Sequence, residues 1–133
     1  MNMKDERQFV GYSKYRSRLV DGHVHTELCP HGSGDRTALM IEKAIELRIE
    51  KVCLTEHAPL PKAFAAEYGG DQKAYDTASL KLNQVDSYLE LGRQLQRAYG
   101  THIDISLGFE VDYIPGFEAD IQEFLDRYGP LTD

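Results

Sequence analysis

Three short apolar segments alternate with three amphipathic segments along the chain, and this order restricts the possible folds more than any other feature. The apolar segments are residues 18–26, 51–55 and 103–114, and the amphipathic segments are residues 36–49, 79–99 and 117–128. In the amphipathic segments apolar residues recur at three- and four-residue steps, which is the spacing of a helix with one buried face. Strands that alternate with helices pair in parallel through crossover connections. The order therefore predicts an α/β fold of about three βα units.

A histidine or a glutamate lies at or just after the end of each predicted strand. His23 and His25 are two residues apart, so their side chains should point to the same face of the first strand. His31 follows in a loop, His57 comes after the second strand, and Glu110 lies toward the end of the third. Because parallel strands place their carboxyl ends on one side of a sheet, we expect all five side chains to converge. Imidazole and carboxylate groups together suit zinc, iron or manganese.

Local patterns give further expectations. The run at residues 51–55 is almost continuously apolar and β-branched, which indicates a strand buried on both faces. Asp35 is placed to cap the helix that follows it. Leu82, Val85 and Leu89 should belong to the buried stripe of the longest helix. The polar connection at residues 62–78 is long for a loop, and it is either a lid or binding loop or a tolerated surface insertion.

Composition narrows the class of protein. The chain has 133 residues, enough for one domain, and a formal net charge of −7, which disfavours a nucleic-acid partner because no basic stripe is present to neutralise phosphates. We expect residues 1–17 to form a loose leader and residues 18–133 the folded domain. No apolar run is long enough for a membrane span. Cys29 and Cys53 give no disulfide framework, which favours a cytoplasmic location.

Four motifs, taken in order, resemble the polymerase-and-histidinol-phosphatase (PHP) family, and within it the monofunctional histidinol-phosphatases of histidine biosynthesis. The motifs are residues 21–26 (DGHVHT), 29–35 (CPHGSGD), 55–61 (TEHAPLP) and 108–113 (GFEVDY). The resemblance implies a distorted seven-stranded β/α barrel with up to three metal ions at the carboxyl ends of its strands. It also implies a phosphomonoesterase that hydrolyses L-histidinol phosphate to L-histidinol and phosphate.

The family pattern assigns a role to each candidate residue. The resemblance implies that His23 and His25 bind one metal, that Glu110 bridges it to a second, and that His31 and His57 bind a third. Two carboxylates beside these ligands, Asp21 and Glu56, either orient imidazole rings or are solvated groups at strand ends. Arg36 either contacts the substrate phosphate or is a surface residue of the first helical turn.

The family site also needs further histidines and an Asp-x-His pair that this chain does not contain after its third helix. His102 lies at the start of a predicted strand, on the wrong side to replace them. We therefore expect the chain to be a truncated form, corresponding to the N-terminal part of the barrel. Alone it should be weakly stable, oligomeric or inactive, and the exposed edge of its sheet is the candidate surface for self-association.

Two alternative functions stay open. The first is another PHP phosphoesterase or a nuclease. The second belongs to a different class, a non-catalytic metal-binding module in which Cys29, His31, Cys53 and His57 hold a structural zinc ion. The spacing of these four residues fits zinc-finger patterns poorly.

Overall fold

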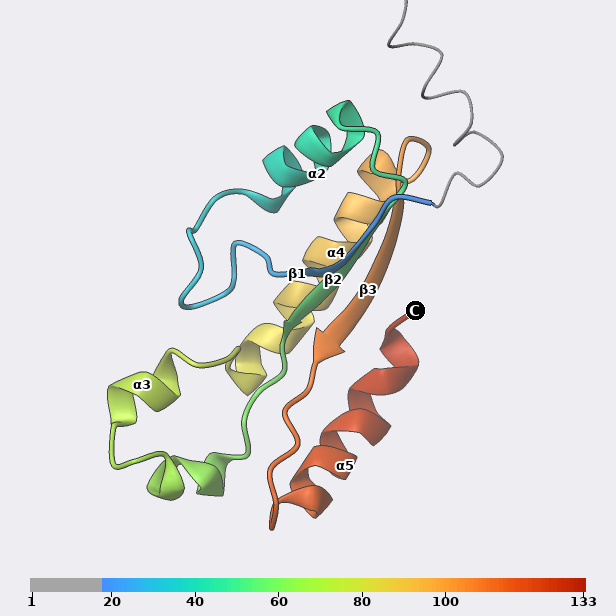
Figure 1. The fold of residues 1–133 in the computed structure, drawn as a ribbon. Helices are drawn as coiled ribbons and strands as arrows, with labels where there is room; N and C mark the ends of the chain where they lie inside the picture. The colour runs from blue at the N-terminus through green and yellow to red at the C-terminus, as the bar shows by residue number, and fades with distance from the viewer. Residues whose placement is uncertain (1–17) are drawn as a thin grey trace, which may run out of the picture.

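Three parallel strands form a sheet in the order β1-β2-β3 in the computed structural model, which describes residues 18–133 (Figure 1). The strands are β1 (Val20–Val24), β2 (Lys51–His57) and β3 (Asp104–Glu110). All pairs are parallel, and β2 is in register with β3 from Lys51↔Asp104 to His57↔Glu110. This confirms the predicted α/β order. The predicted leader, residues 1–17, lies outside the described residues.

Helices connect the strands and follow the last one. They are α2 (Thr37–Glu46), η2 (Lys62–Glu67), α3 (Gln72–Asp76), η3 (Leu82–Gln84), α4 (Val85–Tyr99), α5 (Glu118–Tyr128) and η4 (Gly129–Leu131). In Figure 1, α4 runs behind the sheet and α5 lies beside β3. Within residues 18–133, no helix has both the length and the apolar character needed to cross a membrane.

The core lies between one face of the sheet and the helices that cover it. Val52 and Leu54 of β2 and Leu107 of β3 are almost fully buried there, against Ile41 of α2 and Tyr88 of α4. Burial alternates along β2: Val52, Leu54 and Glu56 are buried, and the residues on either side of each are only half-buried. The prediction that this strand is buried on both faces is therefore right for one face only. The second, half-buried face leads to the histidines.

Helix α4 approaches β3 unusually closely. A Cβ atom on Gly92 would lie 2.4 Å from Cδ1 of Leu107, so any larger residue at this position would force the buried Leu107 side chain to shift. One turn earlier, the buried hydroxyl of Tyr88 donates to the carbonyl oxygen of Gly108 (2.6 Å) and accepts from the N–H of Glu56 (3.3 Å). These contacts fix α4 against the two strands that carry His57 and Glu110.

Helix α2 differs from its predicted form at both ends. Its N-cap is Arg36 and no side chain caps it from that position, so the predicted cap by Asp35 is wrong. The N–H of Thr37 instead donates to the carboxylate of Glu27 (2.6 Å), which comes from the preceding loop. The helix ends early because Arg48 adopts a left-handed conformation with φ of 59°. The N–H of Ile49 then bonds back to the carbonyl of Ala44, which closes the last turn.

The first turn of the predicted long helix is separate from α4. Leu82 lies in η3 and is 57% exposed, so its predicted place in the buried stripe is wrong. Val85 and Leu89 are buried as expected. The stripe therefore begins one turn later than the apolar spacing indicated.

Residues 62–78 are ordered and contain two helical turns, η2 and α3. Asp71 caps α3, since its Oδ1 accepts from the N–H of Ala74 (3.0 Å). The hydroxyl of Tyr75 lies within hydrogen-bonding distance of the carbonyl oxygens of Leu60 (3.3 Å) and Pro61 (3.1 Å). These bonds tie the segment to the end of β2.

Replacing Tyr88 by Phe should lower the free energy of unfolding by about 1–3 kcal/mol, because the N–H of Glu56 and the carbonyl of Gly108 then lose a buried partner. Urea unfolding followed by circular dichroism measures this change. Tyr99→Phe is the matched control, since the Tyr99 hydroxyl bonds Glu42 at the surface. Equal stability of the Tyr88→Phe variant and the parent would contradict the proposed role of this bond.

Candidate functional site

Four histidines meet at the carboxyl ends of β1 and β2. Nε2 of His23 lies 3.0 Å from Nε2 of His25. Nε2 of His57 lies 3.1 Å from Nε2 of His31. The rings of His25 and His57 stack with centroids 4.2 Å apart, so the two pairs form one continuous cluster.

Glu110 joins this cluster through one oxygen. Its Oε2 lies 3.2 Å from Nε2 of His23, 3.3 Å from Nε2 of His25 and 3.2 Å from Nδ1 of His57. The parallel register of β2 and β3 places Glu110 directly opposite His57. The structure therefore brings together all five residues that the sequence singled out.

Strands β1 and β2 position their histidines differently. His57 is the last residue of β2, so its backbone is held by the sheet. In β1 the pairing register shifts between Asp21 and Val24. An irregularity of this kind bends a strand and redirects its side chains. It lies at the segment that carries His23, just before His25.

Glu56 is a fully buried carboxylate beside the cluster. Its Oε1 lies 2.9 Å from Nδ1 of His25 and accepts from the N–H of His57 (3.1 Å). Its Oε2 accepts from both the N–H (2.8 Å) and the hydroxyl (2.6 Å) of Thr26. Burial alone would raise the pKa of Glu56, but the bonds from Thr26 and His25 outweigh it and hold the pKa below its ordinary value. The group is therefore ionised and fully hydrogen-bonded.

The tautomers of two histidines follow from their partners. Nδ1 of His31 lies 2.8 Å from the carbonyl oxygen of Thr77, which can only accept, so Nδ1 carries the proton. Nδ1 of His25 likewise donates to the Glu56 carboxylate. When His25 and His31 are neutral, the Nε2 atom of each ring is therefore unprotonated, and its lone pair points into the cluster. Burial, and then the neighbouring His25, lower the pKa of His57, which favours its neutral form too.

One buried oxygen tests whether these residues fit a metal. Oε2 of Glu110 is buried, yet it has no hydrogen-bond partner of acceptable geometry among the described residues, although three ring nitrogens surround it. A carboxylate oxygen left without a donor is costly in a protein interior. A cation shared between this oxygen and the lone pairs of His23 and His25 would satisfy all three, and these residues form one of the groups of converging donor atoms. The donor set therefore fits divalent metal ions.

The remaining predicted site residues lie elsewhere. Asp21 accepts from the backbone N–H of His23 (3.4 Å), and among the described residues it contacts no imidazole ring. Arg36 is exposed at the N-cap of α2, and its guanidinium has no ion-pair partner within residues 18–133. The sequence left two roles open for Asp21 and Glu56; within residues 18–133 only Glu56 hydrogen-bonds an imidazole ring.

Cys29 is a buried neighbour of the cluster. The sequence included it only in the alternative structural zinc site, not among the histidines and Glu110. Its sulfur belongs to a converging group with His25, Glu56 and His57. Burial raises the pKa of its thiol, which disfavours the thiolate that binds metals. The Cys-Pro-His sequence at residues 29–31 was the available signal for this proximity. Cys53 belongs to neither group of converging donors among the described residues, so the four-ligand zinc site of the alternative function is not formed.

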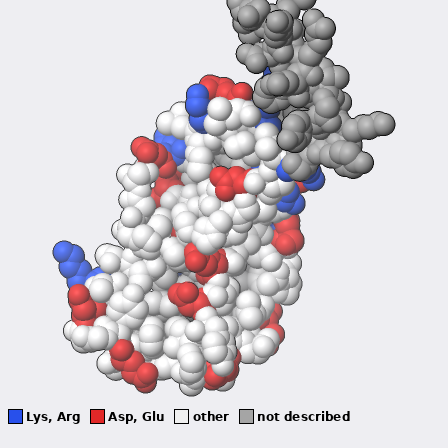
Figure 2. Space-filling view, in the orientation of Figure 1, with Lys and Arg blue, Asp and Glu red and all other residues white. Residues whose placement is uncertain are grey.

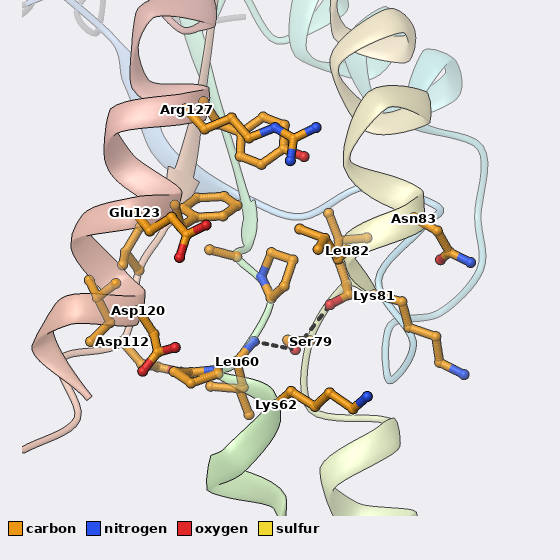
Figure 3. Close-up of a pocket in the computed structure, with 18 of the residues that line it drawn as sticks. Leu60, Lys62, Ser79, Lys81, Leu82, Asn83, Asp112, Asp120, Glu123 and Arg127 are labelled. Carbon is orange, nitrogen blue, oxygen red and sulfur yellow. Dashed lines mark hydrogen bonds between the residues drawn. The ribbon is translucent and has the colours of Figure 1, made fainter. Parts of the chain in front are cut away.

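Two cavities flank the end of β2. One, of about 580 Å³, opens beside His31 and His57. The other, of about 720 Å³, lies between α5 and η3, and none of the histidines line it. Figure 3 shows this second cavity, with Asp120 and Glu123 of α5 on one side and Lys62 and Lys81 on the other. The cavity of about 720 Å³ is the larger of the two, but it is the cavity of about 580 Å³ that adjoins the histidine cluster.

Acidic side chains are spread over the face shown in Figure 2, whereas basic side chains lie mainly at its upper end and form no continuous stripe on it. The net charge of −7 points the same way. Neither feature suits a surface that follows a nucleic-acid backbone.

Comparison with known proteins gives the family. The sequence profile of the PHP domain matches residues 21–130, which include every histidine of the cluster and Glu110. The chain belongs to the PHP family. The predicted resemblance is thereby confirmed, and the metal dependence of the family agrees with the donor cluster.

Relatives of this PHP chain include histidinol-phosphatases. It is 41% identical over 113 residues to the histidinol-phosphatase of Bacillus subtilis, covering 85% of this chain and 40% of that protein. A crystal structure of a candidate histidinol phosphatase from Listeria monocytogenes matches with a TM-score of 0.83 and 41% identity, over 86% of this chain and 42% of that one. The chain thus has the α/β fold of part of a PHP phosphatase, and it spans about 40% of the length of the Bacillus relative.

Glu56→Gln should weaken zinc binding by about 10- to 100-fold, because an amide oxygen replaces the charged acceptor that orients His25. Competition with a chromophoric chelator measures the zinc affinity. Asp21→Asn is the control and should keep the parent's affinity, since Asp21 contacts only a backbone N–H. Equal losses in the two variants would contradict a specific role for Glu56.

Proposed function

We propose that this chain forms part of the metal centre of a phosphoric monoester hydrolase that converts L-histidinol phosphate to L-histidinol and phosphate. The proposal is made for the substrate and the activity together, because the relatives named for this reaction are more than twice as long as the matched part. The observation that carries it is the meeting of three imidazoles, those of His23, His25 and His57, around an oxygen of Glu110 that has no hydrogen-bond partner within residues 18–133.

The proposed roles follow the PHP family pattern. His23 and His25 would hold one cation, Glu110 would be shared between it and a second, and His31 and His57 would hold a third. Among the described residues, His23, His25 and Glu110 form one group of converging donor atoms. Glu56 orients the ring of His25. It also accepts from the N–H of His57 and so holds the end of β2 in place. Arg36 remains a predicted contact for the substrate phosphate, and Asp21 a solvated carboxylate at a strand end.

Zinc, iron and manganese all suit this mixture of imidazole and carboxylate donors. When bound, such cations polarise the phosphoryl group and make the attacking water more acidic. The residues of the chain contribute the geometry: Thr77 and Glu56 hold the protons of His31 and His25 on Nδ1, so both Nε2 lone pairs stay available. The pKa of Glu56 stays low, so its charge persists at neutral pH.

The competing functions are less well supported. A nuclease would need a surface that neutralises a phosphate backbone, and the acidic balance of the chain opposes this. A structural zinc module would need Cys53 beside His31 and His57. We also propose a cytoplasmic location, consistent with two free cysteines, and self-association through the outer edge of β1, where Leu19 and Val20 are about half exposed.

Turnover of L-histidinol phosphate should exceed that of p-nitrophenyl phosphate and of single-stranded DNA in the metal-loaded protein. The assay is release of phosphate or of nucleotide, with the chain alone and with the chain mixed with the C-terminal part of the Bacillus relative. Glu110→Gln should reduce turnover by about a hundredfold or more, because the bridging charge is lost.

Glu123→Gln serves as the matched control, since Glu123 lines the cavity of Figure 3 and not the cluster. Treatment with a chelator should abolish turnover, and added zinc or manganese should restore it. Faster turnover of single-stranded DNA or of p-nitrophenyl phosphate, both by the chain alone and by the mixture, would refute the proposed substrate.

A further inference from the structure

The cavity of about 580 Å³ is continuous with the histidine cluster. His31 and His57 form part of its lining, and its other walls come from outside the cluster. Phe64 and Tyr68 of segment 62–78 form one wall, and Asp112, just after β3, belongs to another. Asp112 also lines the neighbouring cavity shown in Figure 3. A molecule held at the histidines by one end would therefore have the rest of its structure in this cavity.

The walls combine aromatic rings with one uncompensated negative charge. Phe64 and Tyr68 meet edge to face with centroids 5.6 Å apart, and Phe64 packs in the same way against Phe117 at 5.4 Å. Asp112 is exposed and has no hydrogen-bond or ion-pair partner among residues 18–133, and no lysine or arginine lines the cavity. A flat or cationic group is the complement of such walls.

The size of the cavity agrees with an organic ligand. Pockets that enclose small organic molecules have volumes of about 300–1,000 Å³, whereas a phosphate group alone occupies far less. The metal-ligand cluster already provides for the phosphate. The additional volume is therefore available to the alcohol part of the ester.

We propose that this cavity binds the amino-alcohol end of the substrate, with Asp112 pairing with its ammonium group and Phe64 and Tyr68 packing against its ring. The inference rests on the proposed function, and it adds the residues that would select this phosphoester over others. A cationic group attached to an aromatic ring is what L-histidinol presents beyond its phosphorylated oxygen. Asp112 is a specificity residue here, since it contacts the substrate away from the reacting phosphorus.

The same inference gives segment 62–78 its role. The carbonyl of Thr77 holds His31 at 2.8 Å, and the hydroxyl of Tyr75 ties the segment to the end of β2. The segment therefore carries a wall of the cavity and orients a proposed metal ligand at once. Of the two alternatives left by the sequence, it is a binding loop.

Titration of the zinc-loaded full chain with L-histidinol, followed by calorimetry, tests the proposal. Asp112→Asn should raise the dissociation constant about fivefold, the effect of losing one solvent-exposed ion pair. Tyr68→Leu should weaken binding by a similar factor, about fivefold. Asp112→Glu, which keeps the charge, should recover most of the affinity. Asp120→Asn is the matched control, because Asp120 is an exposed carboxylate that lines only the cavity of Figure 3.

Asp112→Asn should also lower the ratio of kcat/KM for L-histidinol phosphate to that for p-nitrophenyl phosphate, whereas Asp120→Asn should not. Unchanged L-histidinol affinity in Asp112→Asn, or equal losses in the two variants, would overturn the inference. Turnover of L-histidinol phosphate without any effect of Asp112→Asn would leave the proposed function standing and reject the cavity. Weakened L-histidinol binding in a protein that never hydrolyses its phosphate would do the reverse.

Discussion

The architecture of the site depends on one buried charge. Glu56 has no exposed surface, and an ionised carboxylate in such a place is strongly unfavourable unless every acceptor position is used. Thr26, His25 and the backbone of His57 supply these bonds from two strand ends. Because the carboxylate needs both strand ends in place, β1 and β2 cannot move apart without leaving it unsatisfied. The geometry of the proposed metal ligands is thus coupled to the stability of the sheet.

The connection continues from this carboxylate into the core. The N–H of Glu56 donates to the hydroxyl of Tyr88, which in turn donates to the carbonyl of Gly108 in β3. Burial raises the pKa of Tyr88 far above its usual range, so the hydroxyl keeps its proton and remains a donor. Helix α4 packs tightly on Leu107 through Gly92 and holds this tyrosine in place. Polar and apolar contacts therefore fix the strand that carries Glu110 relative to the strand that carries His57.

Sequence patterns predicted the repeated order of strands and helices, because apolar periodicity is a local property of the chain. They also predicted that the histidines and Glu110 would lie at one end of the sheet, since parallel pairing leaves no other arrangement. They failed where a distant partner decides. Glu27 rather than Asp35 serves the start of α2, and nothing near Thr37 in the sequence indicates this. The left-handed conformation of Arg48 ends that helix without a glycine. The exposure of Leu82 and the burial of Cys29 likewise depend on which elements pack over them.

The bond from Thr77 to His31 is made by the main chain. Exchanging the Thr77 side chain leaves the carbonyl where it is, provided that the path of the backbone is kept. Residues 62–78 can therefore diverge in sequence, aromatic positions included, while His31 keeps its tautomer. Ligand preference and metal binding would then evolve separately, although one short segment serves both. Changes in a single loop would then give this fold new ligands without rebuilding the proposed metal centre.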